Sequence, residues 1–537
     1  MKHHNFACFA AAAAAALCLF AGCGPRDGIY NVTICETTDI HGAYFDSTYD
    51  GKAARSSMAN VASYLRKLRA EDETVVLIDN GDNLQGDNAA YYYNYVATDK
   101  PHIFSRIAEY LHYDAIVMGN HDFETGHPVY DRLSGSSSIP YLAANAVRES
   151  DGKPYFEPYT IIRRGSLKIA IIGMTNANIK SWLGEELWKG IDFQMISDIA
   201  QKWVDYVLKY EEPHLTILSV HSGTRPFGDA EPGPDIESEA LYLARTLEGV
   251  DVVLCGHDHR PFETVVERED GSCVALLNAG SRASNVAQCG VRLDIEGGKV
   301  VSRTFENRLV DMSGYGPDSL FLEMARPDFE EVKAFAGREI GYIDGDLSFE
   351  DAFSGPSAYI SLIHKVQLEA TGADISLTAP LSNHGGVKAG KVTYQNLSEL
   401  YRYENTLYVV EMTGSQIRDF LEYSYDLWLG DKGPSYNYDS ADGIRYTVSR
   451  SAGYGGRVRI ESMCSGEAFD PERTYKVAIN SYRANGGGGH ISRGVGIDPS
   501  SLVVTARYSD IKTLIGDYIS VHRHITPAAS DNWRFTK

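Results

Sequence analysis

The hydrophobic and polar positions divide the first part of the chain, from about residue 28 to 310, into alternating short apolar runs and amphipathic segments. Short apolar runs bounded by turn residues predict buried strands, and apolar residues at helical spacing predict helices that bury one face. Strands that alternate with helices predict a layered α/β domain. The predicted strands are Val32–Glu36, Thr74–Ile78, Ala115–Val117, Leu167–Ile172, Leu215–Val220, Val252–Cys255 and Val274–Leu277, and the predicted helices include Ser57–Arg69, Ile103–Leu111 and Ile196–Lys209.

The pattern changes after residue 325. Pro327 suits the first turn of a helix, and only a narrow apolar stripe follows it, so residues 326–350 are predicted to form a linker helix. A second, smaller α/β unit is predicted over residues 351–537, with helices at Ala358–Glu369 and Gly414–Tyr423. The first domain is assigned to residues 28–325.

Residues 1–23 resemble a leader rather than part of the fold. A short basic start precedes the apolar run Phe6–Phe20, which is too short for a comfortable membrane span. Small residues then precede Cys23, as in a bacterial lipoprotein signal that is cut before the cysteine and lipidated there. A plain cleaved signal peptide is the alternative. The expected location is the bacterial cell envelope, in the periplasm or at the cell surface, with membrane contact only through a lipid anchor.

Charge and cysteine content limit the possible partners. The chain has 50 Lys and Arg residues against 72 Asp and Glu residues, a formal net charge of −22, which argues against binding of nucleic-acid polymers or of an anionic membrane by the whole surface. The eight cysteines are scattered and lack the spacing of metal ligands, so no disulfide framework is expected.

Polar clusters follow five of the predicted strands, where open α/β sheets place their chemistry. Carboxylate, imidazole and amide groups suit divalent metals such as zinc, manganese or iron. The candidates outnumber the ligands that one ion needs, so two ions sharing a carboxylate are expected. The clusters contain Asp39 and His41, then Asp82, then Asn120, His121, Asp122 and Glu124, then His221, and finally His257 and His259.

The order and the residue types of these clusters resemble those of the calcineurin-like metallophosphoesterases. The stretches Asp39–Gly42, Asn80–Gly86 and Gly119–Glu124 resemble the 5′-nucleotidase family in particular. Later stretches, Leu400–Leu407 and Asn480–Gly487, are most similar to its bacterial periplasmic 2′,3′-cyclic-nucleotide 2′-phosphodiesterase/3′-nucleotidase branch. The resemblance implies an α/β/β/α layered metallophosphoesterase domain followed by a 5′-nucleotidase C-terminal domain.

The resemblance also implies roles for the clustered residues. His121 binds neither ion and serves as the catalytic imidazole, with Glu124 or Asp122 as the carboxylate that orients it. One ion is implied to bind Asp39, His41, Asp82 and His259, and the other Asp82, Asn120, His221 and His257.

In the second domain, the resemblance implies that two aromatic side chains sandwich a nucleotide base. They map to Tyr438 and Tyr482. The glycine-rich loop after Tyr482 is expected to approach the nucleoside with its backbone. The remaining residues of this predicted substrate site are Arg483, Ala484, Asn485, Gly486 and Gly487.

The implied function is that of an enzyme, a metal-dependent phosphoester hydrolase that acts on 2′,3′-cyclic nucleotides and 3′-nucleotides. No arginine follows Thr371–Asp374 in the manner of many 5′-nucleotidases, which favours the cyclic branch. The alternatives are a 5′-nucleotidase or nucleotide-sugar hydrolase, and a non-catalytic lipoprotein that binds nucleotides.

Overall fold

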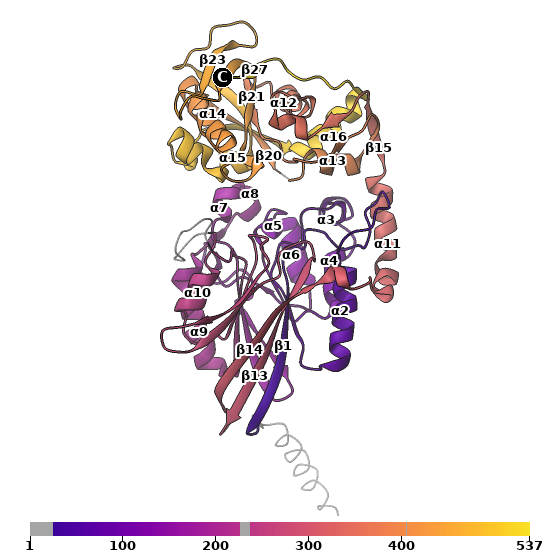
Figure 1. The fold of residues 1–537 in the computed structure, drawn as a ribbon, viewed down its shortest axis with the longest axis vertical. Helices are drawn as coiled ribbons and strands as arrows, with labels where there is room; N and C mark the ends of the chain where they lie inside the picture. Colours follow the sequence, from indigo (N-terminus) through magenta and orange to yellow (C-terminus); the bar gives the residue numbers. More distant parts are fainter. Residues whose placement is uncertain (1–24, 226–236, 404) are drawn as a thin grey trace, which may run out of the picture.

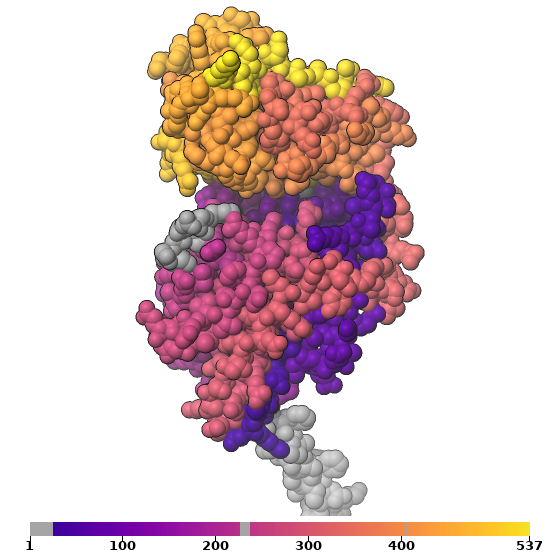
Figure 2. Space-filling model, in the orientation of Figure 1, coloured from indigo at the N-terminus to yellow at the C-terminus, as the bar shows by residue number. Residues whose placement is uncertain are grey.

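The computed structural model describes residues 25–225, 237–403 and 405–537. Two domains are stacked along the long axis of the molecule (Figure 1) and meet face to face (Figure 2). The predicted leader and its Cys23 lie outside the described residues. No helix within the described ranges has the length and apolarity needed to cross a bilayer. The five cysteines in these ranges are unpaired.

The first domain is built on two six-stranded sheets. β1 to β4 run parallel to one another in the first sheet, and β7, β9, β10 and β12 do so in the second. In spatial order the first sheet is β14 (Lys299–Asp311), β13 (Asn285–Glu296), β1 (Gly28–Thr37), β2 (Val76–Asp79), β3 (Ala115–Val117) and β4 (Tyr141–Leu142), and the second is β11 (Phe262–Glu267), β12 (Cys273–Asn278), β10 (Val252–Cys255), β9 (Leu215–Val220), β7 (Leu167–Met174) and β6 (Tyr159–Arg164).

Alternating side chains of each strand enter different cores, as the two faces of a pleated strand require. Ile34 and Val76 join the core between the two sheets, whereas their neighbours Cys35 and Leu77 pack under the helices on the outer face. The helices over the first sheet are α2 (Met58–Glu71), α4 (Ile103–Leu111) and α6 (His127–Ser136), and those over the second are α9 (Ile196–Glu211) and α10 (Ala240–Thr246). This arrangement confirms the predicted α/β/β/α layers.

The linker differs from its prediction. The helix α11 (Ser319–Ala336) begins eight residues before Pro327, which lies inside it. Asp318 starts the helix by accepting a hydrogen bond from the Phe321 N–H at 2.7 Å. The proline removes one helical N–H, and the helix is held instead by burial of Phe321 and Val332 in the core of the first domain.

The second domain starts earlier than the predicted residue 351. β15 (Glu339–Ile343) already pairs with β19 (Gly390–Thr393) and β26 (His524–Ile525) of that domain. Its main sheet is, in order, β21 (Ser440–Asp442), β17 (Ile375–Thr378), β24 (Thr474–Asn480), β20 (Thr406–Thr413) and β25 (Val504–Asp510). Its helices include α12 (Ala358–Thr371), α13 (Tyr394–Leu400), α14 (Gly414–Leu429), α15 (Ser481–Ala484) and α16 (Ile511–His522).

Candidate metal centre and substrate cavity

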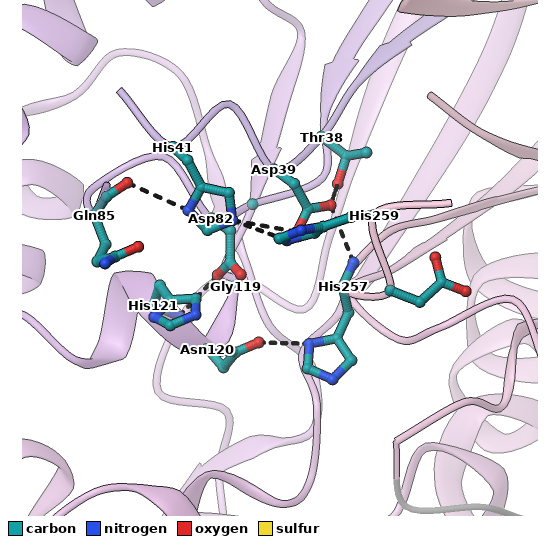
Figure 3. Close-up of polar contacts among 12 residues, drawn as sticks. Thr38, Asp39, His41, Asp82, Gln85, Gly119, Asn120, His121, His257 and His259 are labelled. Carbon is teal, nitrogen blue, oxygen red and sulfur yellow. Dashed lines mark hydrogen bonds and ion pairs between the residues drawn. The ribbon is translucent and has the colours of Figure 1, made fainter. Parts of the chain in front are cut away.

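The first candidate metal cluster comprises Asp39, His41 and His259, whose ligand atoms all lie within 4.8 Å of one another. His259 Nε2 lies 3.0 Å from His41 Nε2 and 3.3 Å from Asp39 Oδ1. The other ring nitrogen of His41 faces the Gln85 carbonyl at 3.3 Å, which leaves Nε2 for a ligand bond (Figure 3). Three side chains that follow β1 and β10 thus converge on one point.

The second cluster comprises Asp82, His221 and His257. Asp82 Oδ2 lies 3.1 Å from His221 Nε2, and the amide oxygen of Asn120 lies 2.8 Å from His257 Nδ1 and 3.2 Å from His221 Nε2. The structure therefore brings together all seven side chains that the sequence nominated as ligands. The Asn80 carbonyl, which the sequence analysis did not single out, lies 2.6 Å from His221 Nδ1 and orients that ring.

The backbone at these ligands adopts a conformation that side chains other than glycine rarely take. Positive φ angles cost free energy at residues with a Cβ atom and are concentrated at functional sites. They occur at Asp39 (50°), His41 (47°), Asp82 (62°), His257 (71°) and His259 (57°). The turns at the strand ends direct the ligands toward the metal centre, and the positive φ angles cost conformational free energy.

Glycines beside the ligands allow the strand ends to approach one another. A Cβ atom at Gly119 would lie 2.2 Å from Asp82 Oδ1, and one at Gly256 would lie 2.2 Å from Thr38 Oγ1. Both distances are too short for any side chain, so these glycines are required by packing against the metal site.

The donor atoms of the two clusters suit a pair of divalent cations. Burial lowers the pKa of His41 and of His257 to about 3, so both rings are neutral and can offer a lone pair. Burial also opposes a charge on His221, but the Asp82 carboxylate outweighs it and raises the pKa of His221 to about 10, so a cation at the second cluster has to displace that proton. Oxygen and nitrogen donors without a thiolate match zinc, manganese or iron.

The two carboxylates left open as partners of His121 have different roles. Glu124 Oε2 lies 2.5 Å from Nδ1 of His121. Asp122 instead accepts backbone N–H groups of Gly119, Asp82 and Asn83, each at 2.9 Å, and so holds the ligand loops in place. Burial opposes a charge on His121, but Asp82 and Glu124 outweigh it and raise its pKa to about 9.

A cavity of about 390 Å³ lies between the two domains over the metal centre. His41, Asp82, Asn120, His121, His257 and His259 line it from the first domain, together with Trp182, which stacks on the His257 ring with centroids 5.2 Å apart. Arg402, Tyr403, Tyr436, Tyr482 and Arg483 line it from the second domain.

The structure does not bring Tyr438 to this cavity. Its ring is buried and stacks on Trp428, with centroids 5.8 Å apart and the planes within 5°. Tyr436, two residues earlier in a short 3-10 helix (Ser435–Asn437), faces the cavity instead and lies edge to face with Tyr482 at 6.4 Å. Sequence spacing could not distinguish the two tyrosines, because the direction of a side chain in and after so short a helix is set by its tertiary contacts.

The loop after Tyr482 supports the site more than it lines it. Arg483 is almost fully buried and donates to the Asp439 carboxylate at 2.8 Å and to the Tyr436 carbonyl at 2.7 Å. A Cβ atom at Gly487 would lie 2.5 Å from the Tyr482 ring. The predicted residues Ala484, Asn485, Gly486 and Gly487 are absent from the cavity lining.

Other cavity residues escaped the sequence analysis. Trp182 and Arg282 belong to none of the motifs, and Arg402 and Tyr403 lie in the stretch Leu400–Leu407, which carried the resemblance but gave neither residue a role. Arg282 follows the strand β12, so the rule that flagged polar residues at strand ends would have found it. Trp182 lies in the cavity by stacking on His257 of its own domain, whereas Tyr403 reaches it through the packing of the two domains.

Two clusters of oxygen and nitrogen ligands that open to one cavity fit a metal-dependent hydrolase site. The comparisons agree. Residues 32–261 match the family model of calcineurin-like phosphoesterases, and residues 339–493 match the model of the 5′-nucleotidase C-terminal domain. The chain belongs to the calcineurin-like phosphoesterases with a 5′-nucleotidase C-terminal domain, and it is a metal-dependent phosphoester hydrolase.

Individual relatives are distant but extend over most of the chain. A 2′,3′-cyclic-nucleotide 2′-phosphodiesterase/3′-nucleotidase of Yersinia enterocolitica is 24% identical over 94% of this chain and 88% of its own. A 5′-nucleotidase of Vibrio cholerae is 26% identical over 89% of this chain and 90% of its own. A solved Staphylococcus aureus chain assigned as a 5′-nucleotidase has a TM-score of 0.80 at 20% identity, covering 95% of this chain and 100% of that one.

Proposed function

We propose that the protein hydrolyses nucleotide phosphoesters with two bound divalent ions, and that 2′,3′-cyclic nucleotides and 3′-nucleotides are its preferred substrates. The observation that carries the proposal is the position of Tyr436 and Tyr482 over the metal centre, in one cavity with it. Aromatic rings stack on any base and contribute about 1–3 kcal/mol per base. The similarity of the chain to the Yersinia enzyme supports the preference for cyclic and 3′-nucleotides.

The seven candidate ligands would hold two ions. Asp39, His41, Asp82 and His259 would hold one ion, and Asp82 with Asn120, His221 and His257 the other. When bound, such ions supply Lewis-acid activation of water and neutralise charge at the phosphorus centre. The chain itself must orient the nucleotide and give a proton to the leaving oxygen.

We expect His121 to give that proton. The Glu124 carboxylate at Nδ1 fixes the ring plane and favours the protonated ring, so that Nε2 carries a proton for a substrate oxygen. The Tyr403 ring lies nearly parallel to the imidazole, with centroids 6.3 Å apart, and covers it from the second domain.

The tyrosines orient the base. A base between two parallel rings needs about 7 Å, twice the contact distance of carbon atoms. Tyr436 and Tyr482 lie edge to face at 6.4 Å, so one ring has to turn when a base enters. Arg483 contacts both tyrosines, because it donates to the Tyr436 carbonyl and its guanidinium lies 5.3 Å from the centre of the Tyr482 ring.

Replacing Tyr436 or Tyr482 with Ala tests this proposal. Each change should raise KM for 2′,3′-cyclic AMP about 5- to 100-fold, because the stacking energy is lost, and should spare a small aryl phosphate diester. Tyr454→Ala is the matched control, since Tyr454 is 56% exposed in the same domain. Equal losses on both substrates would refute the base platform.

The envelope location is proposed from the sequence alone. The leader and Cys23 predict a lipid-anchored protein on the periplasmic side or at the cell surface. Intact-mass measurement of the protein from its native membrane tests this. The prediction is an N-terminal Cys23 with attached acyl chains, and an unmodified N-terminus at any other residue would refute it.

A further inference from the structure

Two arginines from different domains line one end of the cavity. Arg282 follows β12 in the first domain, with φ of 54°, and its backbone N–H donates to the Asp39 carbonyl at 2.8 Å. Arg402 lies between α13 and β20 in the second domain, where the Gln85 amide donates to its carbonyl at 3.2 Å. Both side chains are solvent-accessible, and both line the cavity.

These two charges lack a dedicated counter-ion. Among the described residues, neither guanidinium lies in a salt bridge, and the carboxylate that acts most on Arg282 is that of Asp87. The Asp87 carboxylate is already engaged, because it accepts from the Ala89 N–H at 2.8 Å and from the Tyr49 hydroxyl. The charge of Arg402 acts on Arg282, so the two guanidinium groups repel each other. An anion between the two groups would remove their repulsion.

Arg282 lies beside the first metal cluster, whereas Tyr482 lies beside the second. The Arg282 backbone bonds to Asp39 of the first cluster, while α15, which carries Tyr482, contacts α7 (Ile179–Trp182) beside the second cluster. A nucleotide with its base on the tyrosines and one phosphate at the metals leaves the arginines for a second anionic group.

We propose that Arg282 and Arg402 bind a second, unreacted phosphate of the substrate, so that the preferred nucleotides carry two phosphate groups. Arginine suits this role because its planar fork binds phosphate oxygens in pairs and stays charged when partly desolvated. The inference rests on the proposed nucleotidase function and names its substrate class. The second phosphate belongs either to the sugar, as in adenosine 3′,5′-bisphosphate, or to a diphosphate, as in ADP.

Kinetics on matched pairs of substrates test the inference. For the metal-loaded enzyme, kcat/KM is compared between adenosine 3′,5′-bisphosphate and 3′-AMP, and between ADP and 5′-AMP. The expected result is a preference for the doubly phosphorylated member of at least one pair, about 10- to 100-fold, which Arg282→Ala and Arg402→Ala each reduce to near unity. Arg292→Ala, which removes an exposed charge on β13, should keep the preference.

Two kinetic outcomes would overturn the inference. One is the absence of any preference in the unaltered enzyme. The other is an equal loss on both members of each pair in the arginine variants, which would assign the arginines to the reacting phosphate. A preference found in only one pair identifies the source of the second phosphate and supports the inference.

A binding measurement separates this inference from the hydrolytic function. Adenosine 3′,5′-bisphosphate, 3′-AMP, ADP and 5′-AMP are titrated calorimetrically into full-length protein in chelator, where turnover does not contribute. Tighter binding of a doubly phosphorylated member, lost in both arginine variants and kept in Arg292→Ala, supports the inference even if no nucleotide is hydrolysed. Equal affinities within both pairs in the unaltered protein would contradict it.

Discussion

Nδ1 of His121 lies 2.5 Å from Oε2 of Glu124, at the edge of the metal centre. This contact gives the imidazole a fixed orientation toward the cavity. It also distinguishes Glu124 from Asp122, whose oxygens are occupied by backbone N–H groups.

Glu124→Gln should therefore lower kcat about 10- to 100-fold with little change in KM, because the ring loses its orienting charge. Steady-state kinetics on 2′,3′-cyclic AMP measure the change. Asp131→Asn is the matched control, since it alters a similar His–Asp pair on the surface, between His127 and Asp131 at 3.0 Å. If Glu124→Gln retained full kcat, Glu124 would have no role in orienting His121.

Glu124 and His121 should act as one unit. His121→Ala is expected to lower kcat about 10²- to 10⁴-fold, and adding Glu124→Gln to it should cause no further loss, because the carboxylate acts only through the ring. A double variant whose losses multiply would show that Glu124 acts independently of His121.

Asp122→Asn should destabilise the fold rather than slow the chemistry directly. An amide oxygen can replace only part of a carboxylate that accepts N–H groups from four loop residues, and each lost bond to a charged group costs about 1.5–3 kcal/mol. Differential scanning calorimetry should show a lower Tm than for Glu124→Gln, and metal content should fall with it. An Asp122→Asn protein with unaltered Tm and full metal content would contradict this role.

Gly119→Ala should abolish metal binding at the second cluster. The new Cβ atom would lie 2.2 Å from Asp82 Oδ1, so the Asp82 carboxylate has to move. Elemental analysis of the purified variant measures bound metal. Gly135→Ala is the control, because a Cβ atom at that position in α6 meets no atom within 4 Å. Full metal content in Gly119→Ala would show that Asp82 is not needed in its present position.

Arg483→Lys should weaken nucleotide binding without touching the metal centre. Lysine cannot reproduce the fork that reaches both Asp439 and the Tyr436 carbonyl. KM for 2′,3′-cyclic AMP is expected to rise about tenfold or more, while turnover of a small aryl phosphate diester stays near that of the unaltered enzyme. A similar loss on both substrates would mean that Arg483 supports the whole domain instead.

The metal centre was predictable because strand ends and ligands coincide. Parallel strands place their carboxyl ends at one edge, so Asp39, Asp82 and His221 had to meet once their strands were recognised. Glycine beside a ligand gave a second local signal, at Gly119 and Gly256.

The substrate side was less predictable because it depends on contacts between domains. Tyr436 and Tyr438 carry the same side chain two residues apart, and only packing against Trp428 decides which is buried. Arg282 and Arg402 come from different domains, so only the folded chain brings both to the same cavity. The start of α11 was predicted too late, because Pro327 was assigned to the first turn of the helix. Burial of the helix outweighs the loss of one hydrogen bond, so Pro327 lies inside it.

Phosphate release distinguishes two-metal hydrolysis of cyclic and 3′-nucleotides from the alternative functions. Metal-loaded protein lacking residues 1–23 is assayed with 2′,3′-cyclic AMP, 3′-AMP, 5′-AMP and a nucleotide sugar, each with and without chelator. We expect chelator-sensitive turnover that is fastest on the first two substrates. Turnover mainly of 5′-AMP or the nucleotide sugar would contradict the substrate assignment, and turnover that survives the chelator would contradict the metal-dependent mechanism.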